Sequence, residues 1–336
     1  MALRFLDSFD HYTTLTQKWN VAPGSNSIAA AALRTGIAGM RNVNQNDAGP
    51  QITLDAQGTW IVGYAYRTNN FTTKLLATTT VDAGTVQGCF TINTDGTLTL
   101  RRGVTDVASS ALSLLANVYY YIEFKHIIGN VAGTLEVRVD GSVWATFAGD
   151  SQQTANATAS VIMMSQNSGA GGVANRDFDD IYILDGTGLA PNNDYWGSTQ
   201  IECIVPTGVG NYTNWATLVG APTHWQAEDE VPPDEDTSYI ESAVLNQQDT
   251  YAMGNITPAS ATINGIQVLM RARTTLAGAA NIARLYRNAG VDDQGADIVL
   301  QTSYNYAREV LGLDPITAAA WTVARINSME MGAVVR

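Results

Sequence analysis

Residues 119–141 carry the clearest alternation of hydrophobic and polar side chains in the sequence. Aromatic or aliphatic residues alternate with polar ones from Tyr119 to Lys125 and again from Thr134 to Asp140, and two glycines and an asparagine lie between the runs. A period of two places successive side chains on opposite faces of a β-strand. The pattern therefore predicts a β-hairpin whose strands bury one face and expose the other, as in an antiparallel sheet.

Short runs of the same kind, separated by turns rich in Gly, Asn and Asp, recur along the whole chain. Residues 50–185 need no helix, and evenly spaced short strands are the pattern of a sandwich or jelly roll. The second half also alternates, for example in GIQVLMRART, and WTVARINSM predicts one short helix or turn. We therefore predict an all-β protein of two tandem antiparallel β-sandwich (jelly-roll) domains.

The length of 336 residues exceeds the size at which a single hydrophobic core usually keeps growing, so two domains are expected. Pro191 and two asparagines follow the last strand pattern of the first half, which favours a boundary there. We predict domains at 1–190 and 191–336, with an acidic, proline-containing connector at 228–237.

Charge and composition narrow the class of partner. The formal net charge is −13, so a phosphate backbone would be repelled and no nucleic-acid partner is expected. The N-terminal sequence MALRFLDSFDHY carries acidic residues before any long apolar run, which predicts neither a signal peptide nor membrane insertion. Synthesis in a cytoplasm is the corresponding expectation.

Few residues have the pattern of a cofactor or metal site. Cys89 and Cys203 are distant from any second Cys or His at ligand spacing, so two buried free thiols are predicted, with one disulfide as the alternative. The chain has three histidines and lacks a G-x-S-x-G elbow, a phosphate-binding loop and an H-E-x-x-H motif. We expect no cofactor, no metal and no catalytic residues.

Two clusters of acidic residues are candidates for a metal or catalytic site. The acidic run at 228–236 could bind a hard cation, but it lacks the spacing and glycine of an EF-hand loop, which favours a solvated connector. Asp177, Asp179 and Asp180 could be paired catalytic carboxylates of a glycosidase. Aspartates at the start of a strand more often accept hydrogen bonds from backbone amides, and we favour that interpretation.

Large aromatic side chains in predicted loops are the stronger candidates for contacts. Packing between the sandwiches or against a neighbouring subunit is the first interpretation, and a sugar-binding platform is the second, because aromatic faces beside Asn and Asp suit stacking and hydroxyl recognition. The candidate glycan or interface residues are Tyr195, Trp196, Tyr212, Trp215 and Trp225, the last beside His224.

Several segments resemble known families. The succession of WIVGYAYR, FTINTDGTLTLRRG, YYYIEFKHII, GTLEVRVDGSVWATF and RDFDDIYILDGTG resembles the concanavalin A-like, laminin-G-like jelly roll over residues 1–190. The segments DSFDHY, DYWGSTQIECIVPTGVGNYTNW, DEVPPDEDTSYIES and DPITAAAWTVARINSMEMGAV resemble a family of tailed-bacteriophage virion structural proteins across the whole chain.

The second resemblance implies a place in the phage particle and supplies no catalytic residues. We expect a non-enzymatic virion protein on the particle exterior, in the tail or a fibre, that assembles with other virion proteins and as a homo-oligomer. A host-surface glycan is a further candidate partner. A capsid decoration or head-fibre protein is the alternative location, and a carbohydrate-active enzyme or free lectin is the alternative class.

Overall fold

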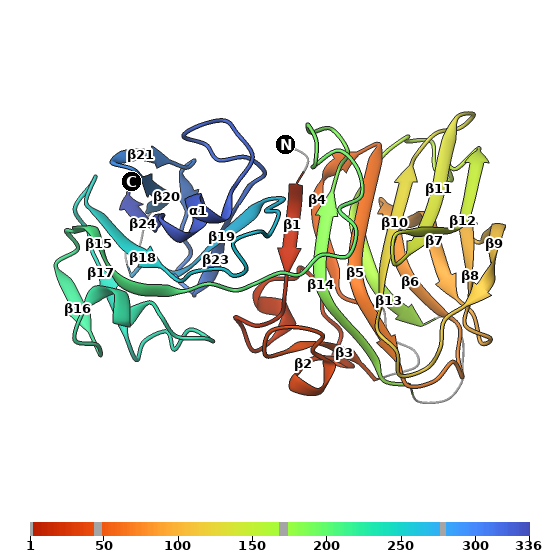
Figure 1. Ribbon diagram of the computed structural model, residues 1–336, viewed down its shortest axis with the longest axis horizontal. Helices are drawn as coiled ribbons and strands as arrows, with labels where there is room; N and C mark the ends of the chain where they lie inside the picture. Colours follow the sequence, from red (N-terminus) through yellow and green to blue (C-terminus); the bar gives the residue numbers. More distant parts are fainter. Residues whose placement is uncertain (1–2, 44–48, 168–173, 276–279) are drawn as a thin grey trace. The chain divides into compact units, whose positions relative to one another are not determined.

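The computed structural model describes residues 3–43, 49–167, 174–275 and 280–336, and the chain forms two compact units, Met1–Ile201 and Glu202–Arg336 (Figure 1). Regular structure is almost entirely β-strand, and the paired strands run antiparallel. The predicted all-β class of antiparallel sandwiches is therefore confirmed.

Unit 1 (residues 1–201) is a sandwich of two sheets. The larger sheet contains β1 (Leu3–Asp7), β2 (Asn26–Ala29), β3 (Gly39–Asn42), β5 (Thr59–Thr68), β10 (Tyr120–Ile127), β11 (Gly133–Val139), β12 (Ser142–Gly149) and β14 (Arg176–Leu184). The smaller sheet contains β4 (Gln51–Gln57), β6 (Leu75–Asp82), β7 (Thr85–Ile92), β8 (Thr97–Arg102), β9 (Thr105–Ser113) and β13 (Ala159–Asn167). Their strand orders are β12-β11-β10-β5-β14-β3-β2, with β1 beside β14, and β4-β13-β6-β7-β8-β9.

The hairpin expected from the alternation at 119–141 is β10 and β11, which pair from Ile122 with Val139 to Ile127 with Thr134. One face of β10 lies in the core between the sheets. Phe124 contacts Phe90 of β7, with ring centroids 5.4 Å apart, and both rings are fully buried. The strand β14 is buried along its whole length, so the chain covers both faces of the larger sheet at this strand.

Unit 2 (residues 202–336) has a central sheet and two ribbons. The sheet contains β15 (Pro206–Thr213), β18 (Gln248–Met253), β20 (Asn281–Asn288), β21 (Val291–Gln294), β22 (Ile298–Val299) and β24 (Glu330–Val335). The ribbons are β16 (Thr217–Val219) with β17 (Tyr239–Glu241), and β19 (Ile266–Ala272) with β23 (Asn305–Leu311). The short helix expected in 321–329 is α1 (Val323–Asn327).

The core of unit 2 lies between the second ribbon, the sheet and α1. Tyr286 of β20 packs edge-on against Trp321, with ring centroids 5.5 Å apart, and Leu311 and Ile326 belong to the same buried cluster. Burying a large apolar side chain contributes about 1.5–3 kcal/mol.

The two units divide between Ile201 and Glu202, beyond the predicted boundary at residue 190. The reason is that residues 191–201 remain packed on unit 1, with Trp196 against Tyr182 at a centroid distance of 4.6 Å. The cysteines also differ in part from expectation. Cys89 is buried and Cys203 is exposed, and neither forms a disulfide among the described residues.

Candidate functional site

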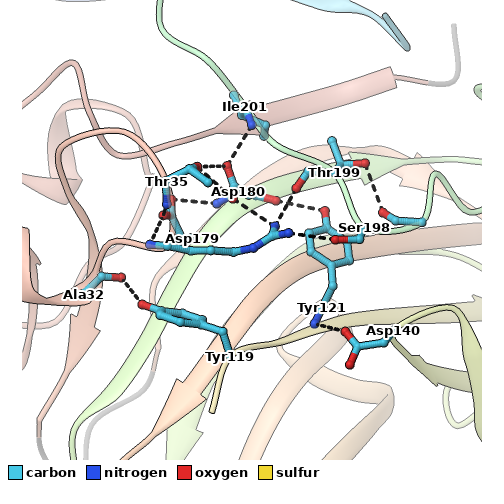
Figure 2. Close-up of polar contacts among 12 residues, drawn as sticks. Ala32, Thr35, Tyr119, Tyr121, Asp140, Asp179, Asp180, Ser198, Thr199 and Ile201 are labelled. Carbon is cyan, nitrogen blue, oxygen red and sulfur yellow. Dashed lines mark hydrogen bonds and ion pairs between the residues drawn. The ribbon is translucent and has the colours of Figure 1, made fainter. Parts of the chain in front are cut away.

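Figure 2 shows the surroundings of the Asp179 and Asp180 carboxylates, two of the three candidate catalytic aspartates of the sequence. Asp180 has a left-handed backbone, with φ of 52°, at a bulge in the pairing of β14 with β5. The bulge turns consecutive aspartates toward the segment that contains Arg34 and Thr35. Both carboxylates are fully buried.

The hydrogen-bond partners of these carboxylates lie within unit 1. Asp179 accepts from the backbone N–H of Arg34 at 2.7 Å and of Thr35 at 3.1 Å. Asp180 accepts from the Thr35 hydroxyl at 2.9 Å and from the backbone N–H of Ile201 at 2.8 Å. Burial, and then the Asp180 carboxyl, raise the pKa of Asp179 to about 7. Backbone donors thus bind Asp179, backbone and side-chain donors bind Asp180, and these contacts attach residues 34–35 and 201 to β14.

Asp177, the third aspartate of the cluster, is bound by two arginine side chains. It forms ion pairs with Arg41 at 2.7 Å and with Arg67 at 2.6 Å. Backbone N–H groups bind Asp179, as the sequence interpretation expects, whereas arginine side chains bind Asp177 and the Arg34 side chain also pairs with Asp180 at 3.1 Å.

The predicted aromatic residues fall into different places. In unit 1, the Trp196 indole N–H donates to the Asn192 side chain at 3.1 Å, and its ring lies on Tyr182. The Tyr195 ring lies under the guanidinium of Arg138, 4.0 Å from its centroid. Both rings are used in packing the 191–201 segment onto the larger sheet.

In unit 2, Tyr212 belongs to β15 and Trp215 follows this strand. The Tyr212 hydroxyl donates to Asp292 at 2.7 Å. The Trp215 indole N–H donates to the Gln247 carbonyl at 3.2 Å, and its backbone N–H donates to Asp249 at 3.3 Å.

Trp225 lines a cavity of unit 2. The cavity has a volume of about 320 Å³ and lies in unit 2 between β15, β16, β18 and the 3-10 turn η3 (His224–Ala227). The chain enters η3 through Pro222 and Thr223, and the Thr223 hydroxyl donates to the Gln226 side chain at 2.7 Å. The walls include Val209, Thr213, Leu218, His224, Trp225 and Tyr251.

A histidine–aspartate pair fixes one wall of this cavity. Nδ1 of His224 lies 2.8 Å from Oδ2 of Asp249, whose carboxylate is fully buried. Because a carboxylate accepts, Nδ1 carries the proton, which leaves Nε2 available for a ligand. Burial raises the pKa of Asp249, and the hydrogen bond from His224 partly offsets this effect.

Sequence reasoning placed His224 beside Trp225 but missed Tyr251 and Asp249. These two come from β18, and pairing of β15 with β18 brings Tyr251 opposite Val209 and Asp249 opposite Thr213. The alternation in DTYAM predicts a strand, but it does not predict which strand pairs with it. The sequence around Tyr251 and Asp249 therefore carries no sign that they lie beside Trp225 and His224.

The acidic connector is held by ion pairs rather than solvated throughout. Glu235 pairs with Arg271, and Asp236 pairs with Arg273 at 2.8 Å. No group of three or more His, Cys, Asp or Glu side chains in the described residues is arranged to hold a metal ion. The described helices also include none with the length and apolarity needed to cross a membrane.

No family model matches the chain, and no curated protein matches it. Solved structures with a similar arrangement include an endo-β-1,4-glucuronan lyase from the fungus Trichoderma reesei, with 8% identity, coverage of 54% of this chain and 95% of that chain, and a TM-score of 0.41. An alginate lyase from Chlorella virus has 11% identity, coverage of 52% and 99%, and a TM-score of 0.37. A heptameric SAP-like pentraxin from Limulus polyphemus has 16% identity, coverage of 42% and 71%, and a TM-score of 0.31.

These likenesses concern the β-sandwich fold alone. They also correct one expectation, namely that the protein is not an enzyme. That expectation is overturned because polysaccharide lyases are among the proteins of similar fold, so the architecture gives no ground for excluding catalysis. At these identities no reaction is carried over to this chain.

Proposed function

We propose that the protein binds carbohydrate in the cavity of unit 2, as a component of the exterior of a tailed-phage particle. The observation that carries the carbohydrate part is the cavity wall formed by Trp225 and His224. An aromatic face provides stacking area for the C–H face of a sugar ring, and a ring nitrogen held by a buried carboxylate provides a fixed partner for a hydroxyl.

The Trp225 side chain is half-buried, although it lies in the segment that connects the two paired strands β16 and β17. A large ring in such a place is expected to pack on something or to contact a ligand. Trp196, by contrast, already has the Tyr182 ring against it. Among the predicted aromatic residues, Trp225 is therefore the best candidate for a glycan contact.

The place in the virion is supported by the sequence resemblance to tailed-phage virion structural proteins. We propose a tail or fibre-like component, assembled with other virion proteins after synthesis in the host cytoplasm. Attachment to the capsid as a decoration or head fibre is the alternative location, and immunogold labelling of intact particles separates the two.

We also propose that the chain assembles with copies of itself. Residues 107–118 and 141–149 contain no charged side chain, although the net charge of the chain is −13. They include most of β9, the residues that follow it, and β12, and these two strands are adjacent edge strands at one end of unit 1. Copies of an acidic protein repel each other least at such an uncharged end. In addition, the backbone groups of an edge strand can pair with an edge strand of another copy.

The test of carbohydrate binding is a glycan array followed by titration calorimetry with the Trp225→Ala variant. Tyr212→Ala is the matched control, because Tyr212 is an aromatic residue of the same unit that does not line the cavity. We expect Trp225→Ala to weaken binding by about tenfold or more, or about 1.4 kcal/mol, and Tyr212→Ala to leave it unchanged. Equal binding by both variants would place the site elsewhere.

A further inference from the structure

The charge around the cavity carries a more specific inference, which rests on the proposed carbohydrate binding. We infer that the cavity of unit 2 selects uncharged sugar units and rejects sugars that carry a carboxylate, such as uronates and sialic acids. The inference is drawn from the lining residues and from the acidic groups directly behind them.

The lining offers an anion no fixed positive charge. Among the described residues that line the cavity, none is Lys or Arg. His224 is the nearest candidate cation, and its Nδ1–H already points to the buried carboxylate of Asp249. A sugar carboxylate placed there would lose water without gaining a Lys or Arg partner, which is costly for a charged group.

Acidic groups lie behind the lining on two sides. The Thr250 hydroxyl, part of the lining, donates to Oε2 of Glu330 at 2.8 Å. On the other side, the fully buried carboxylate of Asp249 lies directly behind the lining residue His224, with its Oδ2 2.8 Å from Nδ1. Negative potential therefore reaches the cavity from β18 and from β24, and a second carboxylate would be repelled.

The remaining lining suits hydroxyl groups. Nε2 of His224 and the hydroxyls of Thr213 and Thr223 can exchange hydrogen bonds with sugar hydroxyls, beside the ring of Trp225. A volume of about 320 Å³ lies at the small end of the range of about 300–1,000 Å³ for ligand sites. The cavity therefore fits a terminal sugar unit better than a long run of polymer.

The experiment compares pairs of ligands that differ in one group. Methyl glucoside is paired with methyl glucuronide, methyl galactoside with methyl galacturonide, and lactose with sialyl-lactose, and each is titrated by calorimetry and by NMR. We expect the neutral member to bind and its acidic partner to bind at least about tenfold more weakly, with the difference shrinking as salt is added.

A charge variant tests the physical cause. Glu330→Gln keeps an oxygen acceptor for Thr250 and removes the negative charge, so it should bind neutral sugars unchanged and reduce the penalty on acidic ones. Acidic ligands that bind as well as neutral ones, in a manner lost in Trp225→Ala, would overturn the selectivity and leave the proposed function standing. Absence of Trp225-dependent binding by every ligand of the series would overturn the proposed function itself.

Discussion

His126 shows how a single polar residue is accommodated between the two sheets of unit 1. It is fully buried, its Nε2 lies 3.1 Å from the Ser151 carbonyl, and its Nδ1 lies 2.8 Å from the Thr80 hydroxyl. A carbonyl only accepts, so the proton is on Nε2 and Nδ1 accepts from Thr80. In the neutral form, both ring nitrogens therefore have a hydrogen-bond partner. The alternation of side chains along the strand does not predict these partners.

The titration of the buried histidines is the first prediction. Burial lowers the pKa of His126 to about 4 and, together with Lys18, lowers the pKa of His11 to about 3, from 6.5. The unfolded chain therefore binds more protons between pH 6.5 and pH 4, so each histidine destabilises the fold as the pH falls through that window. For His126 the full effect is about 3 kcal/mol.

NMR titration of the imidazole signals measures this directly. It is preferred to net stability, because the raised pKa of Asp179 gives a contribution of opposite sign: its folded form takes up a proton as the pH falls below about 7, which stabilises the fold. We expect midpoints below pH 5 for His126 and His11. A midpoint near 6.5 for His126 would show that it is hydrated rather than buried.

The left-handed backbone at Asp180 gives the second prediction. Asp180→Ala and Asp180→Gly both remove the carboxylate, but alanine pays about 1 kcal/mol more for a positive φ. We expect both variants to be less stable than the wild type in urea unfolding, and Asp180→Ala to be the less stable of the two. The reverse order would mean that the bulge does not persist without the carboxylate.

At the scale of elements, local sequence patterns predict individual strands and helices correctly, but they do not predict which distant segments contact each other. The 119–141 hairpin and α1 followed from the period of the side chains, because their partners are adjacent in sequence. The bulge in β14 did not, since nothing in RDFDDIYIL marks where an extra residue enters the pairing.

The 191–201 segment illustrates the same limit. Pro191 and the asparagines beside it have the composition of a linker, yet Trp196 holds the segment on Tyr182. In unit 2, Asp249 lies 25 residues from His224 in sequence, and only the pairing of β15 with β18 and the position of η3 bring them together. The candidate site was therefore recognised through Trp225 and His224 alone.

The third prediction contrasts two tryptophans of different elements. Trp196→Ala removes the ring that packs on Tyr182 and its hydrogen bond to Asn192, so it should lower the stability of unit 1 by about 2 kcal/mol. Trp225→Ala empties part of a cavity wall and should change stability by less than about 1 kcal/mol. Urea unfolding followed by fluorescence and circular dichroism measures both, and a larger loss in Trp225→Ala would indicate that this ring serves packing.

At the scale of the whole molecule, the uncharged end of unit 1 contrasts with an acidic chain. The charged residues at its margin pair within the chain, Arg101 with Asp106 at 2.7 Å and Arg102 with Asp150. Leu112 is 57% exposed on this end. These features are those expected of a surface that meets an identical surface.

The fourth prediction concerns the mass in solution. We expect a species larger than the 35.9 kDa monomer by light scattering, which Leu112→Lys returns toward the monomer mass by placing like charges opposite each other. Val131→Lys is the control, since Val131 is 84% exposed in the turn between β10 and β11. A wild-type monomer, or equal effects of the two lysines, would contradict assembly through this end.

The most direct measurement of carbohydrate binding in unit 2 follows the indole N–H signals of the seven tryptophans during titration with a neutral sugar such as methyl galactoside, methyl glucoside or lactose. We predict that the Trp225 signal shifts in proportion to occupancy, while the signal of Trp196, whose ring lies on Tyr182, stays in place. Shifts at Trp196 without any at Trp225, or no shift at either, would contradict the assignment of the cavity as the sugar site.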